Sequence, residues 1–263
     1  KNANRNTFIQ YIQNLYQPQN TVLVVAGGLE NKQQQFLKQI KQKLANWQNL
    51  DTIKSYPKIK ENQHQPQVLI KSKNTEQSHF CLGYRTFSFF DEQRYALSIL
   101  AAILGGGMSS RLFMQIRERR GLCYYISTQR EHYADTGNLF TQAGIVNDLA
   151  KIKDALKLIF QEQAKIAQGD LTEDEIAKAK ELVKGRLLIN LEDSSSAANF
   201  FATKYLLEKK ITSPEEVIDK LEAVTKQELQ QLAQRIFKNQ NLNFALIGPF
   251  SDKDFSPSDF ISL

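Results

Sequence analysis

The stretch that decides the fold runs from Leu104 to Tyr125 and reads LGGGMSSRLFMQIRERRGLCYY. A triple glycine leads into a basic segment with helical spacing, which breaks at Gly121 before two tyrosines. Three roles are open for such a stretch: a phosphate-binding loop, a basic patch for nucleic acid, or one wall of a peptide-binding site. The rest of the chain decides among them.

The composition is that of an ordinary globular protein, with 263 residues of which 41% are apolar and 24% charged. The net charge of +6 is mild, and lysines such as Lys38 and Lys41 are scattered among glutamines, which favours solvated helix faces over a nucleic-acid stripe. No apolar run is long enough to span a membrane. Because the sequence begins with Lys1 and shows no basic-then-apolar leader, we expect a processed product or a piece of a longer chain, and the compartment stays unassigned.

The first third of the chain alternates helix and strand patterns. Apolar spacing predicts a helix over 6–16 that ends before Pro18, and the continuous apolar run TVLVVAGG at 21–28 predicts a buried strand. An amphipathic helix is expected through 36–47. The two prolines and the absent periodicity of 50–66 indicate a connector.

The remaining pattern predicts the fold class. Strands are expected at 67–72 and 79–88, a helix from Asp91 to the glycines, and a hairpin from Cys123 with its turn near 134–137. Helices then follow from Asn147, with a stop at Gly169, a helix start at Thr172 and a Thr225/Glu228 capping box, until LNFALIG closes the chain as a last buried strand. This order predicts one α+β domain over 1–263, with a mainly antiparallel sheet and helices packed on one face.

The glycines do not form a nucleotide loop. Such a loop needs a Lys and a Ser or Thr after the last glycine, whereas Met108, Ser109 and Ser110 stand there, and a helix rather than a strand precedes the glycines. We expect the glycines to permit a sharp turn and a close backbone approach, with Ser109 or Ser110 capping the next helix.

No self-contained catalytic centre is visible in the sequence. The three histidines, His64, His79 and His132, form neither an HExxH nor an HxxEH pattern, so no zinc site is expected in this chain. Cys81 and Cys123 form no CxxC pair and are expected as free, buried thiols, and no GxSxG elbow occurs.

The opening stretch resembles the C-terminal halves of pitrilysin/insulinase-type zinc metallopeptidases and mitochondrial-processing-peptidase-like proteins. In that family a glycine-rich segment with Ser-Ser-Arg-Leu is followed by Arg-Glu-Lys-x-Gly-Leu-x-Tyr. YQPQNTVLVVAGG, LTEDEIAKAKELVKGRL and EAVTKQELQQLAQRIFKNQNLNFALIG also resemble family segments, so that the resemblance spans nearly all of 7–250. Cys123 departs from the small residue that is usual there.

The resemblance implies half of a clamshell peptidase. Two homologous α+β domains close around a peptide; the first carries HxxEH and binds zinc, and the second supplies an Arg and a Tyr seven positions apart. Arg117 and Tyr124 match that pair. The guanidinium would bind a substrate carbonyl or carboxylate, and the phenol would stabilise the oxyanion formed when zinc-bound water attacks the amide.

The leading hypothesis is therefore the substrate-binding C-terminal half of a zinc endopeptidase, inactive alone because HxxEH is absent from this chain. Its partners would be peptide substrate and an N-terminal zinc-binding half, on the same polypeptide or on a separate subunit. The alternative for Arg117 is that it is one surface charge among several, with Arg111, Arg119 and Arg120. The alternative for Tyr124 is that it is an aromatic residue of the core on a strand. A non-catalytic structural subunit of the same fold, and self-association of the chain, stay open. Nucleic-acid binding is not expected.

Overall fold

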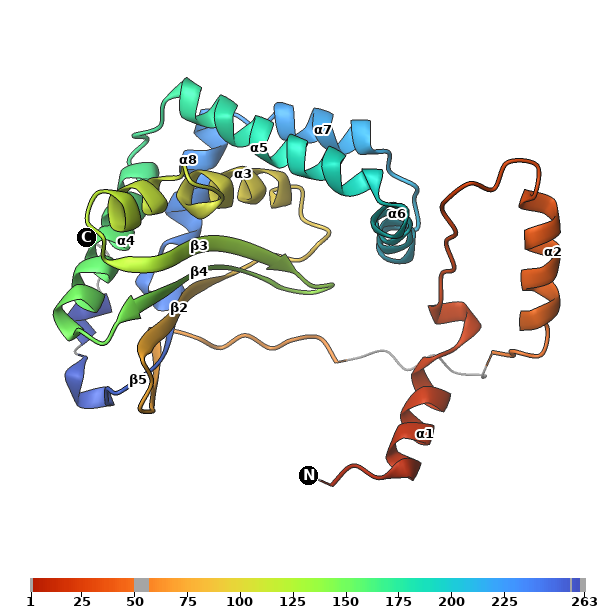
Figure 1. Ribbon diagram of the computed structural model, residues 1–263, viewed down its shortest axis with the longest axis horizontal. Coiled ribbons are helices and arrows are strands. Elements are labelled where there is room, and N and C mark those ends of the chain that lie inside the picture. Colours follow the sequence, from red (N-terminus) through yellow and green to blue (C-terminus); the bar gives the residue numbers. More distant parts are fainter. Residues whose placement is uncertain (1, 50–56, 256, 261–263) are drawn as a thin grey trace. The chain divides into compact units, whose positions relative to one another are not determined.

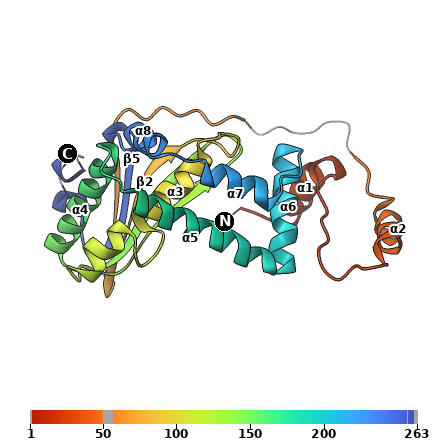
Figure 2. The same cartoon turned by 90° about the horizontal axis from the view of Figure 1, so that it is seen from above.

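The computed structural model describes residues 2–49, 57–255 and 257–260. These described residues fall into two compact units, one within 59–185 and 217–260 and one within 2–49, 57–58 and 186–216 (Figures 1 and 2). This division differs from the expected single domain over 1–263, which stays a prediction. Residues 50–56 of the expected connector lie outside the described residues, and 57–66 form no helix or strand.

The first unit is built on a five-stranded sheet with the strand order β1-β5-β2-β4-β3. Its strands are β1 Gln67–Ser72, β2 Gln77–Thr86, β3 Cys123–His132, β4 Gly137–Val146 and β5 Leu242–Gly248. Only β1 and β5 run parallel; the other neighbouring pairs are antiparallel. The predicted hairpin and closing strand are therefore confirmed.

Helices cover one face of this sheet, because the strands alternate between buried apolar and exposed positions. On β2, Phe80, Leu82 and Tyr84 are buried, whereas His79 and Cys81 are exposed on the other face. The covering helices are α3 Arg94–Gly105, α4 Leu149–Ala167 and α8 Lys226–Ile236 (Figure 1). The predicted α+β class, a mainly antiparallel sheet with helices on one face, is confirmed.

Local helix signals place the ends of the helices. Gly169 adopts a left-handed φ of +87° just after α4, a conformation that glycine adopts without strain. Thr172 Oγ1 accepts the Glu175 amide where α5, Glu173–Glu192, begins, and Thr225 forms the expected capping box with Glu228. Helix α7 spans Pro214–Glu222.

The second unit contains α1 Arg5–Leu15, α2 Gln33–Leu44 and α6 Ser194–Glu208. The prediction of a buried strand over 21–28 is wrong for this structure: no strand pairing occurs there, and Leu23 and Val25 are 60% and 41% exposed. An apolar run forms a strand only where neighbouring strands satisfy its backbone groups.

The triple glycine brings α3 against the sheet rather than against a second helix. A Cβ on Gly105 would lie 2.4 Å from the Thr128 amide nitrogen of β3, so no other residue fits this crossing without a shift. Among the described residues no backbone amide donates to the side chain of Ser109 or Ser110, so the expected serine cap does not form; Ser110 Oγ donates instead to the Gly107 carbonyl at 2.6 Å. The close approach is confirmed, and the capping role is corrected.

Candidate functional site

Arg117 lies on a single turn of π-helix, Phe113–Glu118. The wide turn is shown by the Arg119 amide, which donates to the Met114 carbonyl five residues earlier at 3.0 Å. Ile116 is fully buried and anchors the turn in the core. Arg117 is therefore the first exposed residue beyond the anchor, on a type of turn that is frequent at functional sites.

Gly121 ends this turn in the left-handed region, with φ of +59°. Its amide donates to the Arg117 carbonyl at 3.0 Å, and the Leu122 amide donates to the Ile116 carbonyl at the same distance. A residue with a Cβ would be strained at this φ. The glycine thus closes the turn and redirects the chain into β3.

Tyr124 is the extra residue of a β-bulge at the start of β3. Cys123 pairs with Ile145 and Tyr125 pairs with Gly144, so Tyr124 faces no partner residue on β4. Cys123 is buried and Tyr124 is 73% exposed. Because β3 is the last strand in the sheet order, the bulge presents the phenol at an edge of the sheet.

The structure brings the two predicted residues together. The guanidinium carbon of Arg117 lies 5.9 Å from the ring centroid of Tyr124 and 4.8 Å from that of Phe113, one turn earlier. Each contact is within the range of a cation–π interaction, worth about 0.5–1 kcal/mol at an exposed site. The rings hold the guanidinium near the phenol while its donors stay accessible.

Arg117 differs from Arg111, which pairs with two carboxylates. Among the described residues, no carboxylate lies within ion-pair distance of Arg117, so its charge is available to a ligand. Burial raises the pKa of the neighbouring Cys123 thiol to about 11, and the Arg117 charge opposes that rise. The thiol beside the pair is therefore neutral at ordinary pH.

Arg111 is not a surface charge. Its Nε lies 2.6 Å from Glu175 Oε1, and its Nη1 lies 3.4 Å from Glu162 Oε2. Burial disfavours the charged guanidinium, but the two carboxylates outweigh this and raise the pKa of Arg111. Arg111 therefore holds α4 and α5 to the segment after the glycines.

Tyr125 turns onto the open face of the sheet beside the bulge. Its hydroxyl lies 3.2 Å from His79 Nδ1, and a Cβ on Gly144 would lie 2.5 Å from the Tyr125 ring. The ring therefore lies across the glycine on β4. Sequence reasoning missed this contact, because only the strand register places His79 and Tyr125 side by side.

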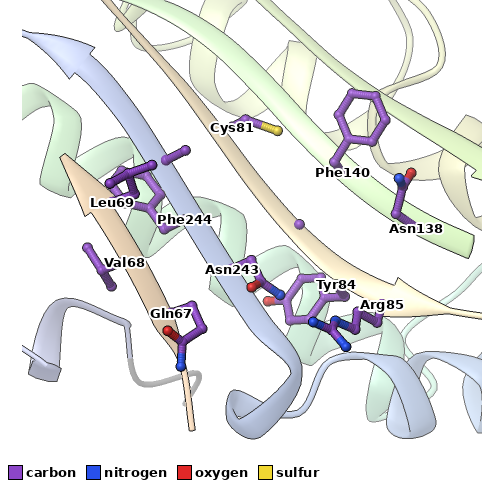
Figure 3. A pocket seen from close by; sticks show the side chains of 12 residues that line it. Gln67, Val68, Leu69, Cys81, Tyr84, Arg85, Asn138, Phe140, Asn243 and Phe244 are labelled. Carbon is purple, nitrogen blue, oxygen red and sulfur yellow. The ribbon is translucent and has the colours of Figure 1, made fainter. Parts of the chain in front are cut away.

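A hollow of about 710 Å³ lies elsewhere on the open face and does not include Arg117 or Tyr124 (Figure 3). We call it the β-face hollow. It forms where residues with little or no side chain, Gly83 and Ala245, occupy neighbouring strands between the larger side chains of Leu69 and Phe140. Cys81 also lines this apolar part, and Arg85, Asn138 and Asn243 add polar groups.

The described residues do not form a metal site. No group of three His, Cys, Asp or Glu side chains among them could hold an ion. His64 contacts Asn62 at 2.8 Å, and His132 Nδ1 lies 3.3 Å from the Phe87 carbonyl. Cys81 and Cys123 are both free thiols, but only Cys123 is buried; Cys81 lies on the exposed face of β2, so the expected burial is wrong for it. Within the described ranges, no helix has the length and apolar character needed to cross a bilayer.

The chain is similar to known proteins of one peptidase family. Residues 2–183 match the family model described as the peptidase M16 inactive domain. An uncharacterized zinc protease of Bacillus subtilis is 29% identical over 94% of this chain and 58% of its own length. An uncharacterized zinc protease of Mycobacterium leprae is 33% identical over 73% of this chain and 42% of its own length. The crystal structure of a protease from Helicobacter pylori shares the fold, with a TM-score of 0.84 at 24% identity over 94% of this chain and 60% of that one.

Proposed function

Because the chain belongs to the family of peptidase M16 inactive domains, we propose that it is the substrate-binding half of a zinc-dependent endopeptidase that cleaves peptides in a closed chamber. The chain spans 58% of the Bacillus subtilis relative and 42% of the Mycobacterium leprae relative, so the complete enzyme would include further chain. Zinc would be held by an N-terminal half, since the described residues of this chain do not fit a metal site.

One observation carries the proposal: an arginine without a carboxylate partner among the described residues lies beside a phenol that a β-bulge exposes. The Arg117 guanidinium would donate hydrogen bonds to a carbonyl or carboxylate of the peptide and fix its position. The Tyr124 hydroxyl would donate to the oxygen on which negative charge develops as water attacks the amide carbon. The cation near the ring would favour that charge further.

The β-face hollow would give the same half a place for a substrate side chain. Its apolar part between Leu69 and Phe140 suits an apolar side chain, and Arg85 adds a positive charge nearby. Arg85 lies 3.7 Å from Glu61, and both side chains are more than one third exposed, so this ion pair is weak enough to exchange partners.

The test is peptide hydrolysis with added zinc, using this chain alone and then mixed with an N-terminal half that carries the zinc motif. We expect activity only in the mixture, abolished by a chelator and reduced by Arg117→Ala. A folded, inactive complex would instead support the alternative of a non-catalytic partner subunit of the same fold.

A further inference from the structure

Residues 5–27 repeat the closing segment of the sheet-bearing unit without a gap. Helix α1, Arg5–Leu15, a 3-10 turn at 18–20 and the run 21–27 stand 221 residues before helix α8, Lys226–Ile236, a 3-10 turn at 239–241 and strand β5. Each helix has 11 residues and each turn has three. The two segments therefore share one local fold.

The repeat extends to individual hydrogen bonds at the same offset. Asn4 and Thr225 each form a capping box with the residue three positions later, Thr7 and Glu228. At the other helix end, Tyr16 donates to the Ile12 carbonyl as Phe237 donates to the Ala233 carbonyl. Coincidence at every one of these positions is not expected from two unrelated helices.

The apolar positions of the two segments coincide, but their burial is opposite. In α8, Leu229, Leu232, Ala233 and Ile236 are at most 2% exposed. Their counterparts in α1 are 36% to 63% exposed; these are Phe8, Tyr11, Ile12 and Leu15. Likewise Phe244 and Leu246 of β5 are nearly fully buried, whereas Leu23 and Val25 are exposed. Residues 5–27 therefore have the apolar pattern of a buried segment, but these apolar side chains are exposed in this structure.

The apolar face of residues 5–27 does not belong to the core of the five-stranded sheet. Strand β5 is hydrogen-bonded on both sides, to β1 in parallel and to β2 in antiparallel orientation, so its place in this sheet is filled. A second copy of the chain has its own β5 place filled in the same way. A place like that of β5, between two strands, is therefore open to the segment only in another sheet, and the relatives have the length for one, since the match leaves 42% of the Bacillus subtilis protein outside it.

We propose that residues 5–27 are the closing helix–strand unit of a second domain with the same sheet order. In it, residues 21–27 insert between one parallel and one antiparallel strand, and the apolar face of α1 packs against that domain's helices. The two strands that pair with residues 21–27 belong to a part of the polypeptide, or to a partner, outside the present 263 residues. Its identity as the zinc-bearing half rests on the proposed function; the insertion itself does not.

Amide hydrogen exchange tests the insertion. The chain is tagged at its C-terminus and purified from the cells that make it, together with the chain to which it is joined or bound. We expect the amides of 22–27 to be protected by at least about 100-fold, as in β5, and to exchange freely in the isolated 263 residues. Free exchange of 22–27 in the purified protein, with β5 protected, would overturn the proposal. Equal protection in the isolated chain would also overturn it, because the strand would then pair within this chain or between its copies.

A matched pair of variants adds a second readout. Ile12 corresponds to the buried Ala233, and the next residue, Gln13, corresponds to the exposed Gln234. In the complete protein Ile12→Asp should lower Tm by about 10 °C, while Gln13→Asp changes it by no more than about 2 °C. In the isolated chain both should leave Tm unchanged. Equal effects of the two variants in the complete protein would refute the proposal. Neither readout uses peptidase activity, so a failed insertion and a failed catalytic role are distinguishable.

Discussion

The guanidinium carbon of Arg117 lies 5.9 Å from the ring centroid of Tyr124, and each residue owes its position to one extra residue in a regular element. A π-helical turn carries Arg117, and a β-bulge carries Tyr124, on the two sides of Gly121. In the bulge, Tyr124 has no partner residue on β4, and its side chain is exposed. A regular helix followed by a regular strand would orient this pair differently.

Tyr124→Phe should reduce kcat in the complete enzyme by roughly 100-fold, with a small effect on KM. The lost hydroxyl would contact charge that exists only near the transition state. Steady-state kinetics on one peptide measures both constants. Tyr125→Phe is the control, because that hydroxyl contacts His79 on the open face. An unchanged kcat for Tyr124→Phe would remove its assigned role.

Arg117→Ala should raise KM and lower kcat, with a loss of about 10-fold or more in kcat/KM, because hydrogen bonds from a charged group to the peptide are lost. Arg117→Lys keeps the charge but not the forked donors, so it should recover only part of the activity. Arg119→Ala, an exposed residue two positions later, is the control. Kinetics indistinguishable from wild type for Arg117→Ala would place Arg117 outside the site.

Arg111→Ala should destabilise the fold by roughly 3 kcal/mol, because the nearly buried Glu162 loses a cation and Glu175 loses two hydrogen bonds. Urea unfolding gives the free energy of unfolding directly. For comparison, Arg119→Ala should change it by less than about 0.5 kcal/mol. Equal stability of the two variants would show that the Arg111 cluster contributes no net free energy.

The raised pKa of the Cys123 thiol should make the free energy of unfolding depend on pH. Its pKa is raised by burial from 9.0 to about 11 in the folded chain, so between these values the thiol ionises more readily in the unfolded chain. Its stabilising contribution is therefore complete below pH 9 and is lost as the pH rises toward 11. Compared with Cys123→Ser, which has no titrating group there, the wild-type free energy of unfolding should fall more steeply over this range. If the free energy of unfolding fell equally with pH in both proteins, the raised pKa of Cys123 would be contradicted. The titration of Cys81 contributes equally to both proteins and does not affect the comparison.

Ala245→Phe should fill the β-face hollow without disturbing the core, since Ala245 is exposed on the open face of β5. We expect a higher KM for peptides with large apolar side chains and an unchanged KM for peptides without them. Leu69→Ala enlarges the same hollow and should act in the opposite direction. Uniform effects on all peptides would show that the hollow binds no substrate side chain.

Local signals were sufficient for most of the fold. The capping box at Thr225, the helix stop at Gly169 and the strand β2 depend on neighbours within a few residues; all three were predicted, the strand with bounds two residues too late. The resemblance to the peptidase family, carried by the motif in the sequence, made Arg117 and Tyr124 a candidate pair. Their proximity needed only the short path through Gly121.

Only the tertiary structure decided the features that depend on distant partners. Arg111 and Arg117 look alike in sequence, but Glu175, 64 residues away, buries one of them while the other stays exposed. TVLVVAG and LNFALIG are both apolar runs, yet only the second has strands on both sides and becomes a strand. Side-chain chemistry and local backbone preference are written in the sequence, whereas burial and strand pairing depend on which other segments are present to supply them.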